Sequence, residues 1–308
     1  MRDLKRTNVG GQAVIEGVMM RGSKTYTVAV RKPDQEIVMD KKPVTAIMTK
    51  YAIFKLPLLR GVAVFIDSMV IGIKTLAYSA EFFEVEEESK PSKVEEYLEK
   101  KLGDKLEDYL IGFSIVVSII LGIALFMVTP LFLSRLFKNF ITNVWLQNLL
   151  EGAIRIAIFL IYIYLISQMK DIQRVFQYHG AEHKTINCLE HEEELTVENV
   201  KKHSRLHKSC GTSFLLVVML VSVAVFAVFN IESPLLRVLS RIIFVPLIAG
   251  LSYEVIRWAR KSETKLACWI SIPGMWLQKT FTTREPDDAQ IEVAITALKG
   301  VLEDEEDN

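Results

Sequence analysis

Long apolar runs alternate with strongly charged segments along this chain. Residues 111–133 read IGFSIVVSIILGIALFMVTPLFL without a single charge, and runs over 149–169, 214–229 and 238–259 contain few charges. A helix of about 20 apolar residues is long enough to cross the hydrocarbon core of a bilayer. The pattern therefore predicts a mainly α, polytopic membrane protein whose membrane domain, residues 110–259, crosses the bilayer about four times.

Basic residues beside these runs set the expected orientation. Lys170 and Arg174 follow the second run. Four more basic residues close the fourth run: Arg257, Arg260, Lys261 and Lys265. Since cytoplasmic flanks carry an excess of lysine and arginine, we expect residues 1–110, 170–212 and 260–308 inside the cell. The expected partner is the lipid bilayer of the plasma membrane, with both termini cytoplasmic.

A small α+β cytoplasmic domain is expected over residues 1–83. TYTVAVR (25–31) and EIVMD (36–40) flank a KPDQ turn, which predicts a β-hairpin. Residues 56–83 form a broadly apolar helix with a narrow polar stripe that recurs every seventh residue. The members of that stripe are Arg60, Asp67, Lys74 and Glu81. Such a helix lies in the membrane interface or packs against the spans. Alternatively it crosses as a fifth span, and the odd number of crossings would then place the two termini on opposite sides of the membrane.

Two charged segments complete the organisation. Residues 84–109 are rich in Glu-to-Lys pairs, which predicts a solvated helical linker into the first span. Residues 260–308 are expected to be a cytoplasmic C-terminal tail. Within that tail, the proline and paired aspartates that open residues 286–302 predict the start of a helix.

Composition narrows the class of protein further. The 308 residues are 50% hydrophobic and 24% charged, with a formal net charge of zero, so nothing favours nucleic acid as a partner. The polar start MRDLKRTNVG does not resemble a cleaved signal peptide. The three cysteines, Cys188, Cys210 and Cys268, are odd in number and widely spaced, which predicts no disulfide framework and favours a reducing compartment.

The chemistry is concentrated in the segment 170–212, where all five histidines lie between His179 and His207. His179 and His183 are four residues apart with Glu182 between them, and His203 and His207 are also four apart, with Cys210 three residues further on. Residues three and four apart share a helix face. Thr196 is a natural helix start for VENVKKHSRLHKS. We therefore expect a helical hairpin that brings the two histidine pairs together around a divalent transition metal, with zinc the best match.

The motif HGAEH also matches the H-x-x-E-H arrangement of zinc peptidases. In that chemistry the histidines hold the metal and the glutamate is the general base, so Glu182 is the predicted catalytic residue. A further carboxylate ligand is expected downstream, and Glu254 inside the fourth run is the candidate.

Simpler interpretations stand beside these. The histidine pairs could form a polar face at the membrane surface, and His191, among glutamates, is expected to be solvated. Cys210 is equally a small packing residue at the bend into the third span. Cys188 and Cys268 are expected to be structural.

The stretch GGQAVIEGVMMRG near the amino terminus lacks the Gly-Lys-Ser/Thr ending of a phosphate loop. Its carboxylate Glu16 lies among glycine and apolar residues, where a charge is costly unless it is paired or metal-bound. Glu16 is therefore either a ligand or hydrogen-bond acceptor at the histidine cluster, or the partner of Arg21 in a buried ion pair.

Four stretches together resemble the YqhQ-like family of uncharacterised bacterial membrane proteins: GGQAVIEGVMMRG, YHGAEHKTINCLE, LTVENV with HSRLHKSCGTSF, and TTREPDDAQIEVAITAL. The resemblance runs over nearly the whole chain. Members of that family are commonly labelled predicted metal-dependent enzymes. Onto this sequence the resemblance maps the following residues: Gly11, Gln12, Glu16, Arg21, His179, Glu182, His183, His207 and Cys210.

Two hypotheses from different classes follow. In the first, the chain is a metal-binding membrane enzyme, a hydrolase acting at the cytoplasmic surface, with a metal held by the histidines, Cys210, Glu16 and Glu254. In the second, it is a non-catalytic scaffold or accessory subunit that docks other membrane proteins or a second copy of itself. A transporter is a weaker third alternative, because few polar groups lie in the spans.

Overall fold

The computed structural model describes residues 9–45, 51–83, 106–208, 210–229, 231, 233–262 and 264–306. Four short strands form an antiparallel meander in the order β1-β2-β3-β4. Their bounds are Gly10–Val14, Gly17–Arg21, Thr25–Arg31 and Ile37–Pro43. Strands β3 and β4 confirm the predicted hairpin. The glycine-rich stretch before them, which had not been predicted as strands, forms a second hairpin, β1–β2.

The turn of the β1–β2 hairpin places Glu16. Val14 pairs with Gly17, so the turn consists of two residues, and Glu16 has a φ of 48°. Gly17 follows because a Cβ there would lie 2.4 Å from the backbone oxygen of Ala29. Gly17 thus serves close backbone packing within the sheet.

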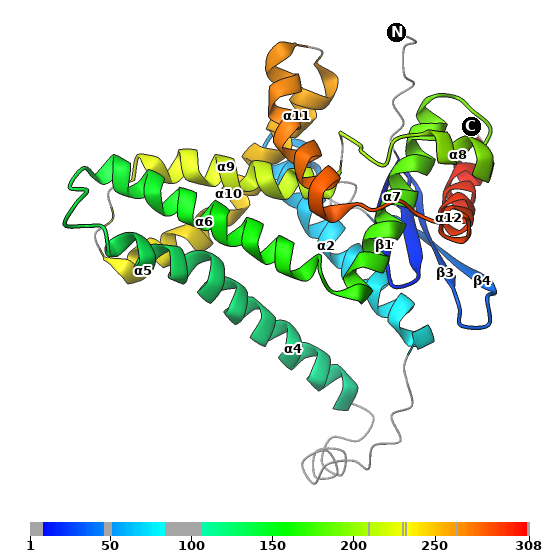
Figure 1. Cartoon of the computed structure of the whole chain (residues 1–308), viewed down its shortest axis with the longest axis horizontal. Helices are drawn as coiled ribbons and strands as arrows, with labels where there is room; N and C mark the ends of the chain where they lie inside the picture. Colours follow the sequence, from blue (N-terminus) through cyan, green and yellow to red (C-terminus); the bar gives the residue numbers. More distant parts are fainter. Residues whose placement is uncertain are drawn as a thin grey trace. The chain divides into compact units, whose positions relative to one another are not determined.

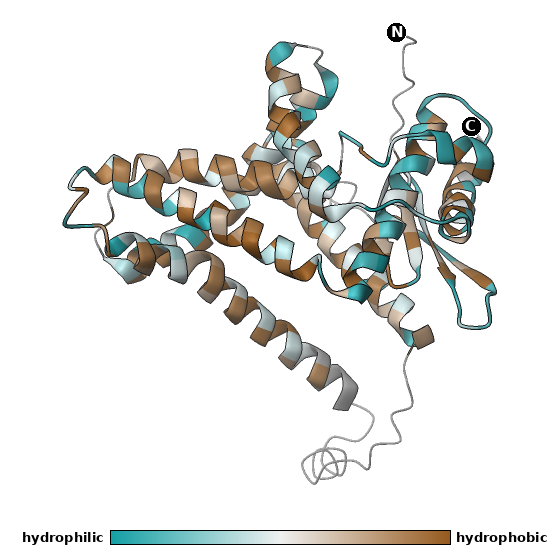
Figure 2. Cartoon of the chain, viewed as in Figure 1, coloured by the Kyte–Doolittle hydropathy of each residue, from teal (hydrophilic) through white to brown (hydrophobic). Residues whose placement is uncertain are grey.

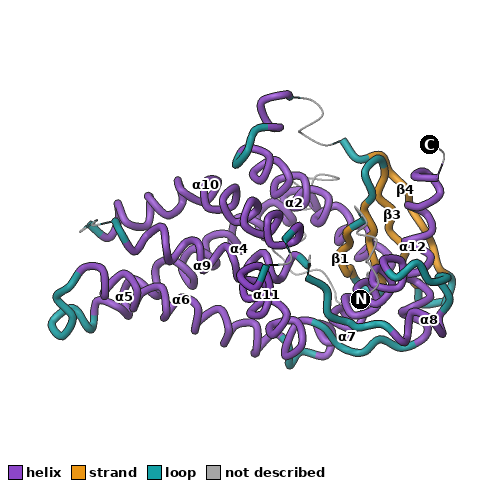
Figure 3. The backbone as a smooth tube through the Cα atoms, turned by 90° about the horizontal axis from the view of Figure 1, so that it is seen from above, coloured by secondary structure: helices purple, strands orange, loops and turns teal. Residues whose placement is uncertain are grey.

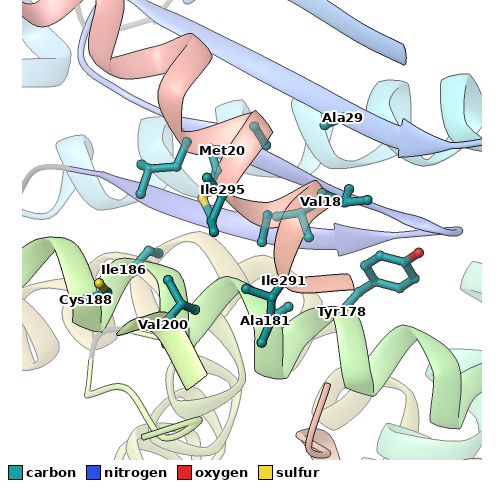
Figure 4. Packing of buried hydrophobic residues seen from close by; sticks show 14 of the residues in the cluster. Val18, Met20, Ala29, Tyr178, Ala181, Ile186, Cys188, Val200, Ile291 and Ile295 are labelled. Carbon is teal, nitrogen blue, oxygen red and sulfur yellow. The ribbon is translucent and has the colours of Figure 1, made fainter. Parts of the chain in front are cut away.

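Both faces of the sheet are covered (Figure 3). On one face α7 (Lys170–Glu190), α8 (Val197–Lys202) and α12 (Asp288–Glu306) build a hydrophobic core with β2 and β3. Figure 4 shows Val18 and Met20 of β2 facing Ile291, Ile295 and the side chains of α7 across that core. On the other face, Tyr26 and Val28 of β3 pack with the C-terminal part of α2 (Leu59–Ala80) and η2 (Glu81–Phe83).

The carboxyl-terminal segment is therefore part of a folded core. The helix expected over 286–302 is confirmed as α12, yet Ala294, Ala297, Leu298 and Val301 are fully buried against the sheet. Their spacing puts the apolar side chains on one helix face, which the sheet covers. The prediction of a C-terminal tail over 260–308 did not foresee this packing, because the strands that cover the helix lie more than 250 residues earlier in the chain.

Four helices are long and apolar enough to cross a membrane by length and composition: Leu59–Phe83, Gly112–Arg135, Val144–Ile166 and Pro234–Lys261. The second consists of α4 (Leu106–Ile123), the π-helical turn η4 (Ala124–Val128) and α5 (Thr129–Arg135); the others are α2 with η2, α6 and α10. Figure 1 traces these helices, and Figure 2 shows hydrophobic residues along them.

The number of long helices agrees with the expected four, but one member differs. The run expected over 214–229 is α9 (Gly211–Ala227), a helix of only 17 residues. The 56–83 segment, expected to lie in the interface, to pack against the spans or to cross as a fifth span, is among the long helices. The run expected over 149–169 ends at Ile166, and α7 begins anew at Lys170 after an extended Met169. Of the expected helical linker 84–109, only its last four residues lie within the described chain, and they are helical.

The described chain forms two compact units. The first comprises Met1–Phe83, Ile161–Val225 and Phe244–Asn308, and the second Glu84–Leu160 and Phe226–Ile243. Within the second unit, Glu151 is fully buried and pairs with three arginines on the apolar helices α6 and α10: Arg155, Arg237 and Arg241. These polar groups within the apolar helices are engaged with one another. All the predicted site residues belong to the first unit.

Candidate metal centre

Helix α7 carries the first three residues of the candidate site. Its sheet-facing side buries Tyr178, Ala181 and Ile186 in the core, which fixes the rotation of the helix. His179, Glu182 and His183 follow the i, i+3, i+4 spacing of one helix face. The rings of His179 and His183 lie 4.4 Å apart. The sequence prediction that this pair shares a face is confirmed.

The hydrogen bonds of the two imidazoles decide which nitrogen is left for a ligand. Nδ1 of His179 lies 2.7 Å from the carbonyl oxygen of Thr282, and Nδ1 of His183 lies 2.7 Å from that of Arg205. A carbonyl only accepts, so each Nδ1 carries the hydrogen and donates it, and each Nε2 offers its lone pair to a ligand when the ring is neutral. Nε2 of His183 is buried and has no hydrogen-bond partner in the described part of the chain.

Cys210, at the start of α9, completes the group. Its Sγ lies 3.1 Å from Nε2 of His179, and ligand atoms of His179, His183 and Cys210 all fall within 4.8 Å of one another. Thr212 contacts the same sulfur through its backbone nitrogen at 3.4 Å and its hydroxyl at 3.1 Å. We call His179, His183 and Cys210 the HHC centre.

The HHC centre fits a zinc ion. Zinc takes imidazole nitrogen and thiolate sulfur, and zinc-binding histidines donate their other ring hydrogen to a carbonyl or carboxylate. Both features are present here. The buried and unpartnered Nε2 of His183 would also be costly without a ligand.

Mutual charge favours the thiolate form of Cys210. Burial disfavours the thiolate, but His179 and His183 outweigh it and hold the pKa of Cys210 well below the ordinary thiol value. Burial likewise opposes a charged imidazole at His179, yet the Cys210 sulfur raises the pKa of His179 to about 9. Burial and the His179 charge lower the pKa of His183, which keeps that ring neutral.

Glu182 is a buried carboxyl close enough to this centre to interact with the charges of His179 and Cys210. The residue is 4% exposed, and its Oε2 has no hydrogen-bond partner within the described residues. Burial raises the pKa of Glu182 to about 8, and the Cys210 charge acts in the same direction. Gly11 of β1 makes room for this side chain, because a Cβ there would lie 2.7 to 2.8 Å from its carboxyl end. The glycine motif and the histidine motif therefore meet at Glu182.

His207 lies beside the centre and outside its ligand group. Its ring is 5.7 Å from that of His183, and its Nε2 faces Glu190 at 3.3 Å. Gln278 clamps the His207 backbone by accepting from its N–H at 3.0 Å and donating to its carbonyl at 2.9 Å. Gln278 and Thr282 form the ends of η5 (Gln278–Thr282). Sequence reasoning missed both residues, because nothing near them in the chain points to histidine.

The second histidine pair does not share a helix face. The cap at Thr196 is confirmed, since its side chain accepts from the Asn199 N–H, but α8 ends at Lys202 and the following segment is extended. The prediction of a helix through His203 and His207 is wrong. Side chains of α7 satisfy the carbonyls of the extended segment instead: Lys184 donates to His203 at 2.9 Å, and Asn187 to Ser204 at 2.6 Å.

His203 consequently lies in a separate group. Its Nε2 faces Glu193 at 3.3 Å, and His203, Glu193 and Cys188 offer ligand atoms within 4.8 Å of one another. The ring of His191 is 4.6 Å from that of His203. Cys188 is fully buried, and burial raises the pKa of its thiol to about 11, as expected for a structural cysteine.

Comparison with known proteins identifies the family. A family described as "Protein of unknown function (DUF1385)" matches residues 56–304, well over half of the chain. The chain belongs to the DUF1385 family. The "Uncharacterized protein YqhQ" of Bacillus subtilis (strain 168) is 37% identical over 299 residues, which cover 95% of this chain and 92% of the relative. The resemblance to YqhQ-like proteins is confirmed, and their names assign no activity. No solved structure matches this chain.

The two remaining ligand candidates of this DUF1385 protein are engaged elsewhere. Glu16 accepts from Arg174, with one contact at 2.6 Å, and from the Tyr178 hydroxyl at 3.1 Å, so its partner is not Arg21. Glu254 of α10 accepts from Nε of Arg60 in α2 at 2.6 Å. Neither carboxylate belongs to the HHC centre; each joins two elements of the first unit.

Proposed function

We propose that this DUF1385 protein is a zinc-dependent hydrolase embedded in the plasma membrane. His179, His183 and Cys210 would be the zinc ligands, and Glu182 the general acid–base. One observation carries the proposal: two imidazole nitrogens and a thiol converge near a buried carboxyl whose Oε2 has no hydrogen-bond partner among the described residues. Catalytic zinc sites have three protein ligands and an open position, whereas structural sites have four protein ligands.

In this proposal zinc, Glu182 and two backbone carbonyls each have a separate role. Zinc, when bound, supplies a Lewis acid that polarises a carbonyl or phosphoryl oxygen and makes water more acidic. Glu182 would accept a proton at Oε2, the atom without a hydrogen-bond partner among the described residues, and return it to the leaving oxygen. The carbonyls of Thr282 and Arg205 hold the two imidazoles in the ligating tautomer.

The membrane assignment rests on the apolar helices α4 with α5, α6, α9 and α10 as the four crossings. The sheet, α7 and α12 share one core and so lie on one side of the membrane, and the end of α2 packs on that sheet, so α2 is not counted as a crossing. We place the HHC centre on the cytoplasmic side, because Lys170 and Arg174 at the start of α7 and Arg260 and Lys261 at the end of α10 mark a cytoplasmic flank. A reducing cytoplasm also keeps Cys210 available as a thiolate ligand. Attaching a reporter enzyme at either terminus tests this orientation.

Metal analysis of the full chain, purified in mild detergent, tests the centre. We expect about one zinc per chain in the wild-type protein, and loss of most of it in His183→Ala and Cys210→Ser, because removal of one of three ligands leaves an incomplete site. The matched controls are His191→Ala and Cys268→Ser, both at exposed positions outside the HHC centre. Equal zinc content in the ligand variants and the controls would refute the centre.

Glu182→Gln tests catalysis separately from metal binding. The variant keeps the shape of the side chain but cannot take up a proton, so zinc content should stay as in the wild type. Untargeted mass spectrometry of cell extracts should then show the same accumulating compound in Glu182→Gln cells as in cells without the protein. A scaffold predicts a Glu182→Gln extract indistinguishable from wild type.

A further inference from the structure

An apolar pocket opens between three helices of the first unit. It has a volume of about 400 Å³, within the range of small-molecule sites, and every residue that lines it is hydrophobic. Helix α9 contributes Val217, Val221 and Ala224, α10 contributes Val255, and α11 (Lys265–Leu277) contributes Trp269 and Pro273. With no polar side chain on its wall, the pocket can recognise only hydrocarbon.

Helix α11, which forms one wall of this pocket, has the length and the exposed apolar face of a helix that lies in a membrane interface. At 13 residues it is about 20 Å long and too short to cross a bilayer. Leu266, Trp269, Ile272 and Trp276 recur every three or four residues and are all exposed, so they form one uncovered apolar face. Tryptophan is enriched where hydrocarbon meets headgroups, and an amphipathic helix of this kind lies in that plane.

The pocket and the HHC centre share helix α9, because Cys210 directly precedes its first residue, Gly211. Gly274, next to the pocket residue Pro273, packs so closely on Ser213 that a Cβ would lie 2.4 Å from the serine oxygen. Gln278 then donates to Ser213 at 2.9 Å and holds the His207 backbone. The pocket residue Val217 follows Ser213 by one turn of α9, and Cys210 precedes it at the start of the same helix.

We infer that the substrate of the proposed hydrolase is a membrane lipid, one acyl chain of which occupies the pocket between α9, α10 and α11. This inference rests on the proposed function, and it names the substrate class for the same centre. A chain held along α9 leaves the polar end of the lipid at the Cys210 end of that helix. Hydrolysis there places the hydroxyl of water on the carbon or phosphorus that is attacked, and its proton passes through Glu182 to the leaving oxygen, so no oxidant or reductant is needed.

Photolabelling tests the occupant. The full chain is reconstituted in vesicles of phosphatidylethanolamine and phosphatidylglycerol that contain a trace of phosphatidylglycerol with a diazirine in its acyl chain. We expect saturable labelling of peptides containing Val217 and Val255. Ala224→Trp fills the pocket and should lower this labelling about tenfold, equivalent to ~1.4 kcal/mol.

The control is Leu215→Trp, which adds the same side chain at an exposed position of α9 outside the pocket lining. It should leave the labelling unchanged. Equal labelling in wild type and Ala224→Trp, or an equal loss in both variants, would overturn the assignment of an acyl chain.

Separate analysis of lipid and aqueous extracts tests the substrate class. We expect the compound that accumulates in Glu182→Gln cells to partition into the lipid extract, and Ala224→Trp to accumulate the same compound while keeping its zinc. Accumulation in the aqueous extract alone would overturn the lipid assignment and leave the hydrolase standing. If the Glu182→Gln extract is identical to the wild-type extract, both the proposed hydrolase activity and the substrate inferred for it are refuted.

Discussion

Gly11→Ala is a stringent test of how the amino-terminal glycine motif acts on Glu182. The new Cβ would lie 2.7 Å from Cγ of Glu182 and 2.8 Å from Cδ and Oε1, whereas an ordinary contact begins near 3.4 Å. The carboxyl must therefore move by about 0.7 Å. Over-packing of this kind costs about 1–3 kcal/mol of folding free energy, and a shift approaching 1 Å at a catalytic group lowers its rate about 10²-fold.

The neighbouring glycine offers a matched control. A Cβ at Gly10 meets nothing within 4 Å, so Gly10→Ala should change the free energy of unfolding by less than about 0.5 kcal/mol. Equilibrium unfolding in mild detergent measures both variants. In a Glu182→Ala background the clash partner is gone, and the penalty of Gly11→Ala should largely disappear. A penalty that persists in that background, or equal effects at Gly10 and Gly11, would refute the proposed contact.

Further expectations concern titration and metal content. Burial raises the pKa of Glu182 from 4.5 to about 8, so metal-free protein should lose stability as the pH rises through that window, and Glu182→Gln should flatten the loss measured by unfolding at several pH values. Because its pKa is held well below the ordinary value, Cys210 in metal-free protein should react with a small thiol reagent faster than Cys188 at the same pH, as followed by mass spectrometry. Glu254→Gln removes the charge that pairs with Arg60 and should lower thermal stability by about 1 kcal/mol at this partly exposed site, with zinc content unchanged.

The elements that sequence reasoning predicted correctly depend on local rules. An uncharged run of more than 20 residues is recognisable as a long apolar helix in any context, and alternating residues around KPDQ predict a hairpin because the strands are neighbours. The pair His179 and His183 needed only the helical repeat. The helix start at Thr196 needed only one side-chain oxygen three residues before a backbone N–H.

The errors lie where distant residues compete with a local rule. His203 and His207 have the same spacing as the first pair, but Lys184 and Asn187 of α7 take the carbonyls of the segment between them, so the helix ends before His203. Glu16 was expected to pair with Arg21 or a metal, and it pairs with Arg174, which lies 158 residues away. No spacing in the sequence encodes either choice.

By itself, then, the sequence determined the apolar helices, the hairpin and the residue types offered as candidate ligands, because hydropathy, turn chemistry and helical periodicity act over a few residues. Tertiary structure alone decided which of these candidate residues meet. In the folded chain Cys210 lies beside the first histidine pair, His203 lies in a different group, and Gly11 contacts Glu182. Those outcomes depend on which buried donors and acceptors find partners when the sheet, α7 and the carboxyl-terminal helices pack, and that competition is settled only when the whole chain folds.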